Sequence, residues 1–429
     1  MVMNDEIKRA GFFQNLTALT LGNVLVRPIW VFFSIYMSAE YLGKEGFGVF
    51  NFAISLMTVV AELADLGITH YANRELVRRP DFGSVLLTNV LVVKGGATLL
   101  IVLAAWTGAW LGHQSATLQW ALVWAGLYTA VFRHLEFLRA FFRANQVLKY
   151  ESISMIVEKS LVVLGGVGFL LVFFSPEAAL FGMSLGMVTT FLLVLYGLHR
   201  YMAAVNMRLL NLSLAQTMYR SALPMGLMGL FIMAYRYMGV LVLYALYGEA
   251  TVGVYSLPLR IIETLQLIPT ILGATIFAYF TQSLHENRLV DFKRMLQKSL
   301  LSMLGVGFAA VVAVWLGGYQ FIKLFKPEFA AAEGLIKLLI WSFPVTCLNS
   351  ILVLALMALD EQRFMAKAVG GAMLAALGLN FWLVSQFEVY GAIAAFLAMD
   401  ALLCMALLSQ ALHKIQVLAK EKRVARQLD

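Results

Sequence analysis

The stretch LMTVVAELADLGITHYANRELVRRP, Leu56 to Pro80, joins a strongly apolar run to a basic segment and carries two acids at its centre. Glu62 and Asp65 are three residues apart, so a helix places them on one face. The acids are followed by three arginines, Arg74, Arg78 and Arg79. A charge at membrane depth is costly, so these acids require either partners or a function.

The whole chain shares this apolar character. Of its 429 residues, 61% are hydrophobic and 13% are charged, against about 25% charged in soluble proteins. Apolar segments of spanning length recur throughout, and a helix is the fold that satisfies every backbone group in lipid. We therefore predict an all-α polytopic membrane protein with about twelve transmembrane helices. The predicted spans are residues 13–39, 47–72, 84–111, 118–142, 151–174, 178–198, 222–247, 251–280, 299–321, 334–358, 368–387 and 390–412.

An internal repeat divides these spans into two halves. YLGKEGFGVFNFAIS (Tyr41 to Ser55) aligns without gaps on LYGEATVGVYSLPLR (Leu246 to Arg260), sharing a glycine before the turn and a Gly-Val-aromatic triplet. Because six is even, both halves enter from the same side, so the repeat is parallel. We predict a six-helix bundle over 1–200, an amphipathic cytoplasmic linker over 201–221, a second bundle over 222–412 and a basic cytoplasmic tail over 413–429.

The distribution of cations predicts the orientation. Of the 32 Lys and Arg residues, 23 fall in segments on the side of the N-terminus, and only Lys44, Lys323 and Lys326 fall in loops on the other side. The positive-inside rule then places both termini in the cytoplasm. The formal net charge of +8 is thereby explained by anionic lipid headgroups, so no nucleic-acid partner is implied.

Six cations remain at membrane depth, namely Arg27, Lys94, Lys159, Arg236, Arg260 and Lys337. Such residues face the interior of the protein and are candidates for function. Arg27 and Arg236 lie near the middle of the first helix of each half, where two guanidinium groups could meet an anionic cargo. The alternative is that neighbouring acids neutralise them. Tyr235 and Tyr237 flank Arg236 and could stack on sugar rings, although most aromatic residues in such proteins are packing or interface residues.

The remaining deep charges divide between a transport role and a structural one. Glu62 and Asp65 could bind a proton or sodium ion together, close a gate by pairing with Lys94 or Lys159, or brace the basic loop. Arg260 and Glu263 share a helical face and could simply pair with each other.

Three further charged residues lie deep in predicted spans. Glu158 and Lys159 are adjacent, so we expect them to point apart and find separate partners. Asp400 is a lone acid deep in the last span, with no partner evident from the sequence. It is a second candidate for coupling to an ion gradient.

Enzymatic chemistry finds no support in the sequence. No phosphate-binding loop or HExxH motif occurs. Cys347 and Cys404 fall within predicted spans and are too few for a disulfide framework or zinc site. We therefore expect a transporter with no catalytic residues, no metal centre and no cofactor.

The run YLGKEGFGVFNFAISLMTVVAELADLGITHYANREL, with LRAFFRANQVLKYESISMIVEKSLVVLGGVGFLL (Leu138 to Leu171), resembles polysaccharide flippases of the Wzx-like, O-antigen type. In the second half, YGEATVGVYSLPLRIIETLQLIP and LALMALDEQRFMAKAVGGAMLAALGLNFWLV resemble later segments of the same family. The resemblance covers nearly the whole chain and places it in the multidrug/oligosaccharidyl-lipid/polysaccharide (MOP) exporter superfamily. It implies a V-shaped, MATE-like pair of bundles in the inner membrane.

The resemblance also implies a cargo. Family members turn over undecaprenyl-pyrophosphate-linked oligosaccharide from the cytoplasmic to the outer leaflet, alongside membrane lipids and polysaccharide assembly proteins as partners. A lipid II flippase or a multidrug exporter of the same superfamily is the alternative, and a membrane glycan ligase or polymerase is a further one. Deep cations disfavour a cavity for cationic drugs, and a ligase or polymerase usually needs an extramembrane domain that the short loops do not provide.

Overall fold

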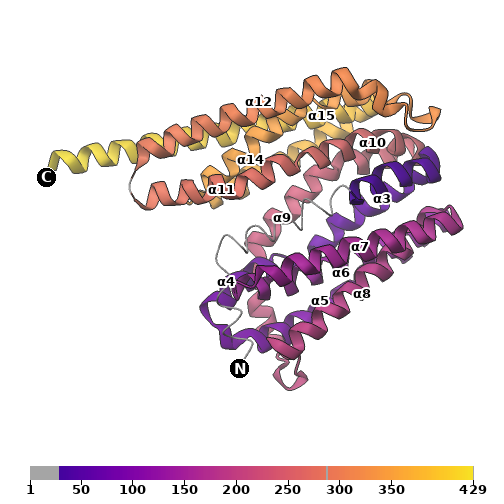
Figure 1. The fold of residues 1–429 in the computed structure, drawn as a ribbon, viewed down its shortest axis with the longest axis horizontal. Coiled ribbons are helices and arrows are strands. Elements are labelled where there is room, and N and C mark those ends of the chain that lie inside the picture. Colours follow the sequence, from indigo (N-terminus) through magenta and orange to yellow (C-terminus); the bar gives the residue numbers. More distant parts are fainter. Residues whose placement is uncertain (1–28, 287, 429) are drawn as a thin grey trace. The chain divides into compact units, whose positions relative to one another are not determined.

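The computed structural model describes residues 29–286 and 288–428, and in these ranges every regular element is a helix. Arg27 and the first part of the first predicted span lie outside the described residues. The chain divides into two compact units, the first ending at Tyr237 and the second beginning at Met238. We call them unit 1 and unit 2 (Figure 1).

Unit 1 contains the helices that follow the N-terminal segment (Figure 1). They are the π-helix η1 (Phe32–Met37), α3 (Ser38–Asp65), α4 (Ile68–Arg78), the short η2 (Pro80–Phe82), α5 (Gly83–Leu111), α6 (Ala116–Ala144), α7 (Leu148–Phe173), α8 (Pro176–Tyr201), the short η3 (Met207–Leu209) and the first part of α9 (Leu212–Tyr247). The residues predicted as a linker, 201–221, therefore include η3 and the start of α9.

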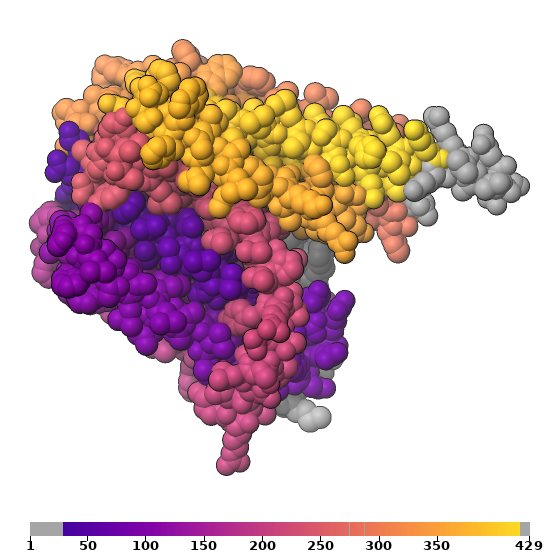
Figure 2. All heavy atoms as spheres, turned by 180° about the vertical axis from the view of Figure 1, so that it is seen from behind, coloured from indigo at the N-terminus to yellow at the C-terminus, as the bar shows by residue number. Residues whose placement is uncertain are grey.

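Unit 2 begins within α9 and continues to the C-terminus. Its other helices are α10 (Glu249–Leu265), α11 (Leu267–His285), α12 (Leu289–Ile322), the short η4 (Pro327–Phe329), α13 (Ala332–Leu339), α14 (Ser342–Ala358) and α15 (Gln362–Leu428). Figure 2 shows that α15, in yellow, lies on the surface of this unit over much of its length.

The helices agree with the predicted spans. Among the described residues, eight helical segments are long and apolar enough to cross a membrane, or nine if the bent pair α13–α14 forms one span. Some of these segments contain two predicted spans. The backbone leaves helical geometry at Gly43 (φ 68°) within α3, between the first and second predicted spans. It does so again at Glu388 (φ 49°) within the 67-residue α15. A straight helix of that length would measure about 100 Å, far more than a bilayer requires.

A further break follows the two acids of the opening stretch. Leu66 (φ 41°) ends α3 in the left-handed conformation, and Gly67 (φ 78°) precedes α4 in the same region. A glycine adopts this conformation without steric cost. The predicted span over 47–72 is therefore two helices, and the break comes directly after Asp65.

The α9 helix packs against this break without room for a side chain. A Cβ added to Gly67 would lie 2.5 Å from the backbone nitrogen of Gly226, and one added to Gly226 would lie 2.1 Å from the carbonyl carbon of Leu66. Close backbone approach through small residues is a common way for membrane helices to associate. The start of α9 is thereby held against the α3–α4 junction inside unit 1.

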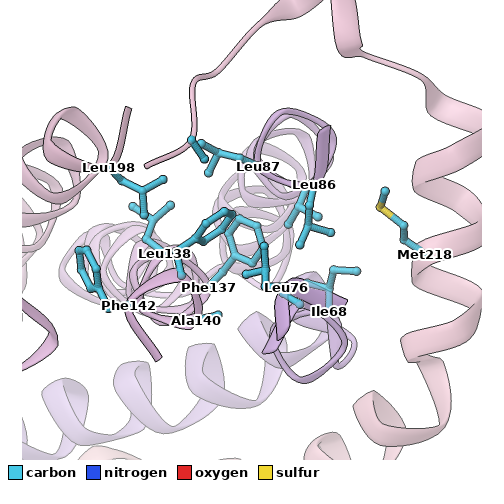
Figure 3. Close-up of a cluster of buried hydrophobic side chains, with 14 of the residues drawn as sticks. Ile68, Leu76, Leu86, Leu87, Phe137, Leu138, Ala140, Phe142, Leu198 and Met218 are labelled. Atoms are coloured by element: carbon cyan, nitrogen blue, oxygen red, sulfur yellow. The ribbon is translucent and has the colours of Figure 1, made fainter. Parts of the chain in front are cut away.

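A hydrophobic cluster lies next to the α3–α4 junction (Figure 3). It joins Ile68 and Leu76 of α4 to side chains of α5, α6, α8 and α9. Its aromatic members include Phe137 and Phe142 of α6, and Met218 reaches in from α9. These contacts fix α5 and α6, which carry Lys94, Arg133 and Arg139 among the buried charges described below.

The close approach of α9 predicts a large cost for the smallest possible side chain. We expect Gly226→Ala to lower the free energy of unfolding by at least about 1–3 kcal/mol, because the methyl group must displace backbone. Gly95→Ala on α5 is the control, since a Cβ there meets nothing within 4 Å. Thermal unfolding in detergent should give a lower Tm for Gly226→Ala only. Equal Tm values for the two variants would contradict the packing.

At the C-terminal end of unit 2, Glu361 holds the extension of α15. Its carboxylate lies 2.8 Å from Lys414 Nζ and accepts a hydrogen bond from Gln410 Nε2 at 3.0 Å. Both residues of the ion pair lie outside the predicted spans. The hydrogen bond from Lys414 lowers the pKa of Glu361 below its ordinary value. The contact is therefore complete above that ordinary pKa and is lost as the pH falls through the lowered one.

We expect Glu361→Gln to speed amide hydrogen exchange in residues 410–420 at pH 7, because the ion pair is removed. The difference from wild type should shrink and then disappear as the pH falls through the lowered pKa of Glu361, which lies below the ordinary carboxyl value of about 4.3. Asp360→Asn, at the exposed preceding residue, is the control. Exchange rates should be corrected for their intrinsic pH dependence. A difference that persists unchanged at low pH would rule out the carboxylate as the cause.

Candidate functional site

Asp65 forms an ion pair in the interior of unit 1. Its Oδ1 atom accepts from Lys94 Nζ of α5 at 2.5 Å and from Thr69 Oγ1 of α4 at 2.5 Å. The two charged residues are 3% and 0% exposed. Lys94 was one of the two cations that the sequence offered as a gate partner. The other, Lys159, lies elsewhere.

Lys94 has two further contacts that make its burial tolerable. Its ammonium group donates to the backbone carbonyl of Arg133 at 2.9 Å and lies 5.5 Å from the centroid of the Phe137 ring. A buried ammonium without such contacts would be strongly destabilising. Lys94 therefore joins α3, α5 and α6 at one point.

Glu62, one turn earlier on α3, pairs with Arg133 of α6. Its side chain is 9% exposed and that of Arg133 is 19% exposed, so this pair is the more accessible of the two. The carboxylate also lies against α9, because a Cβ on Gly229 would be 2.7 Å from Glu62 Oε1. The two acids of the opening stretch thus point to two different cations.

A second cluster connects α6 with α7. Arg139 donates to Glu136 at 2.6 Å, to Glu158 at 2.7 Å and to Ser154 Oγ at 2.9 Å. Arg139 is only 1% exposed. Farther along α6, Arg143 Nη1 lies 2.6 Å from Glu151 Oε1. The carboxylates of α7 are therefore neutralised by arginines of the neighbouring helix.

The prediction made for Lys159 was wrong. We expected Glu158 and Lys159 to find separate partners, but Lys159 Nζ lies 2.6 Å from Glu158 Oε1. The four-carbon side chain of lysine is long enough to bend back to an adjacent residue, and the carboxylate has a second oxygen for Arg139. Lys159 also lies 4.8 Å from the centroid of the Trp30 ring.

Most of the cations in the two clusters were not predicted from the sequence to lie there. Arg133, Arg139 and Arg143 were counted as cytoplasmic cations at the end of a span, whereas the structure places them inside α6 among acids. Their spacing, with Glu136, follows the three- and four-residue periodicity of one helical face. The matching acids of α7 are seven residues apart, which is two turns. This shared periodicity could have predicted the ion pairs between α6 and α7.

In unit 2 the deep charges have partners as well. The predicted pairing of Arg260 with Glu263 is present on α10 at 2.8 Å. Asp400 Oδ2 on α15 accepts from Thr346 Oγ1 of α14 at 2.6 Å, and its backbone carbonyl accepts from Asn349 Nδ2 at 3.1 Å. Asp400 is 5% exposed. Its contacts are thus hydroxyl and amide groups of the adjacent helix, which the sequence alone did not identify.

The remaining predicted residues lie on α9. Tyr235 and Arg236 are partly buried and Tyr237 is buried, at the point where unit 1 ends. Arg27, the predicted counterpart of Arg236, lies outside the described residues. Among the residues that the structure describes, no group of three or more His, Cys, Asp or Glu side chains could hold a metal ion.

The positive and negative charges balance within each of the two clusters of unit 1. Each acid in the two clusters faces at least one cation, so neither cluster offers a surplus of positive charge to an anion. What these clusters can do is exchange partners or take up a proton, because every ion in them depends on another.

Comparison with proteins of known structure gives the fold. An inward-facing multidrug resistance MATE family transporter of the MOP superfamily superimposes with a TM-score of 0.71 at 15% identity, covering 94% of this chain and 96% of the other. A MOP superfamily transporter from Pyrococcus furiosus, described as having a binding pocket of reverse polarity, gives 0.65 at 14%, covering 95% and 96%. The MATE transporter VcmN from Vibrio cholerae, in its bent form, gives 0.62 at 14%, covering 97% and 99%. No curated protein matches the sequence.

These helices and this fold define a multi-pass membrane protein with a MATE-like fold, as predicted. The family model described as "Polysaccharide biosynthesis protein" matches residues 12–284, which is more than half of the chain. The chain belongs to this family, and the resemblance to polysaccharide flippases is confirmed.

The Asp65–Lys94 pair predicts a strong asymmetry between single and double substitutions. Lys94→Met should cost about 3–5 kcal/mol of stability, because it leaves a buried carboxylate without its cation. Lys94→Met with Asp65→Asn should recover most of that loss, since neither member of the pair is then charged. Thermal unfolding of the purified protein measures both. A double variant as unstable as the single one would show that the charges do not depend on each other.

Proposed function

We propose that the protein is a flippase that moves an undecaprenyl-pyrophosphate-linked oligosaccharide from the cytoplasmic to the outer leaflet of the inner membrane by alternating access. The observation that carries this proposal is the family match over residues 12–284, on a chain whose fold is that of MOP transporters. Both termini are proposed to be cytoplasmic, in accordance with the distribution of Lys and Arg. Polysaccharide assembly proteins are the proposed partners.

The proposed cargo contacts are Arg236 and Arg260, together with Arg27, Tyr235 and Tyr237. Arginine suits this cargo because its guanidinium fork matches the oxygen atoms of a pyrophosphate, and tyrosine rings suit sugars. Lys94 was proposed with this group. Its complete burial against Asp65 instead favours a role in gating, by exchange of partners within the cluster.

Coupling to an ion gradient is proposed at Glu62. It is buried on α3, its partner Arg133 is the more exposed member of the pair, and it lies against α9, a helix that continues into unit 2. Protonation of Glu62 would release Arg133, which changes the charge next to α9. Asp65, Lys159, Glu263 and Asp400 are further candidates for coupling or gating, with H⁺ or Na⁺ as the ion.

The cargo proposal is tested by flipping of a fluorescent undecaprenyl-pyrophosphate oligosaccharide in proteoliposomes. Arg236→Ala should lower the rate about 10-fold or more, in keeping with the loss of a charge-assisted hydrogen bond of about 1.5–3 kcal/mol. Arg208→Ala, on the exposed 3₁₀ turn, should leave it unchanged. A wild-type protein that flips only lipid II, or that exports amphipathic drugs instead, would show that the cargo is wrong while the fold is right.

The coupling proposal is tested by imposing a pH gradient in the same assay. Wild-type flipping should respond to the gradient, and Glu62→Gln should not, because a glutamine cannot exchange a proton. The double variant Glu62→Gln/Arg133→Gln removes the uncompensated cation and keeps the test valid if the single variant is unstable. A full response to the gradient in both variants would exclude Glu62, and a response to Na⁺ alone would exclude proton coupling.

A further inference from the structure

Unit 1 has a second feature besides the charge clusters: a groove between three of its helices. The groove has a volume of about 440 Å³ and lies between the C-terminal part of α6, the first half of α7 and the end of α8. Its walls include Phe142, Tyr150, Ser154, Val157, Val194 and Tyr201. This volume falls within the range of about 300–1,000 Å³ that is usual for small-ligand sites.

The walls of the groove are apolar and continue into an apolar outer surface. Ile153 and Leu193 line it and are 44% and 55% exposed. The nearby Leu192 is 55% exposed as well. In a membrane protein such a surface faces acyl chains, and a groove within it is a place where one chain can be held more tightly than in the bulk bilayer.

The hydroxyl group of Ser154 in the wall of the groove is already hydrogen-bonded within the protein. Ser154 Oγ accepts a hydrogen bond from Arg139 Nε at 2.9 Å and donates one to the backbone carbonyl of Glu151 at 2.7 Å. Its hydrogen bonds are thus directed into the protein. The deep part of the groove therefore suits hydrocarbon.

One end of the groove is aromatic and basic. Tyr150 and Tyr201 are 42% and 59% exposed. The guanidinium of Arg200 lies 5.7 Å from the centroid of the Tyr201 ring and donates to Tyr196 Oη at 3.3 Å. Lys149, next to Tyr150 in the chain, is exposed. Tyrosines with adjacent Lys or Arg are typical of the level of lipid headgroups, and such cations attract anionic lipid.

We propose that this groove binds one anionic phospholipid of the adjacent leaflet. An acyl chain occupies the space between α7 and α8, and the phosphate of the headgroup meets Arg200 and Lys149. The site is independent of the cargo proposal, because it uses none of the residues assigned to the cargo. Its lipid would also hold α7 and α8 together over the Arg139 cluster.

Gly197 makes the proposal testable without damage to the fold. It lines the groove, and a Cβ added to it meets nothing within 4 Å. Gly197→Leu should therefore fill the groove and leave the helix packing intact. Gly168→Leu is the matched control, because Gly168 lies on α7, does not line the groove and also has no atom within 4 Å of an added Cβ.

The experiment is native mass spectrometry of the full-length protein in detergent with equal amounts of phosphatidylglycerol and phosphatidylethanolamine. Wild type and Gly168→Leu should retain one tightly held phosphatidylglycerol, and Gly197→Leu should lose it. Lys149→Gln and Arg200→Gln should each lower the preference for phosphatidylglycerol by about fivefold, which corresponds to the attraction of one surface cation for anionic lipid.

Three results would overturn the proposal. The first is equal retention of phosphatidylglycerol by Gly197→Leu and Gly168→Leu, because the groove would then not be the site. The second is equal retention of the two lipids by wild type, because the basic end would then have no role. The third is displacement of phosphatidylglycerol from the groove by undecaprenyl phosphate at equal concentration, because the occupant would then be the tail of a polyprenyl lipid.

Discussion

An ion placed among apolar helices must be neutralised there, and this constraint organises unit 1. Asp65 is held by Lys94, Glu62 by Arg133, and Glu158 by Arg139 and Lys159. Removing Lys94 or Arg133 would leave a buried carboxylate without its cation, which is far more costly than replacing both members of the pair. The charges therefore tie α3, α5, α6 and α7 into one unit and make their relative positions interdependent.

The position of the first cluster explains how charge could be linked to movement. The break at Leu66 and Gly67 comes directly after Asp65, and Gly226 of α9 packs against its backbone. Gly229, one turn along, faces Glu62. Because α9 contributes residues to both units, Glu62 lies against a helix that extends from one unit into the other. The second cluster, between α6 and α7, is held within neighbouring helices of unit 1 and is better suited to a structural role.

Much of this architecture could be predicted from the sequence because the bilayer restricts the choices. A spanning segment must be apolar and about 20 residues long, so composition places the helices, and the expected ends near Gly43 and Glu388 coincide with real breaks. The site was predictable in part. Lys94 and Asp65 were both identified as deep charges, but Arg139 was counted as a loop cation because hydropathy locates the end of a span only to within a few residues.

The sequence by itself therefore determined the class of protein, its all-helical architecture and the family, since these depend on local hydrophobicity and on motifs read in order. Only the tertiary structure decided which ions meet. Glu62 and Asp65 share a helical face, yet they take cations from two different helices, α6 and α5. Lys159 turns back to its own neighbour, and Asp400 finds a hydroxyl and an amide on α14. Such choices depend on how helices distant in the chain are packed and on the reach of each side chain, which local sequence does not encode.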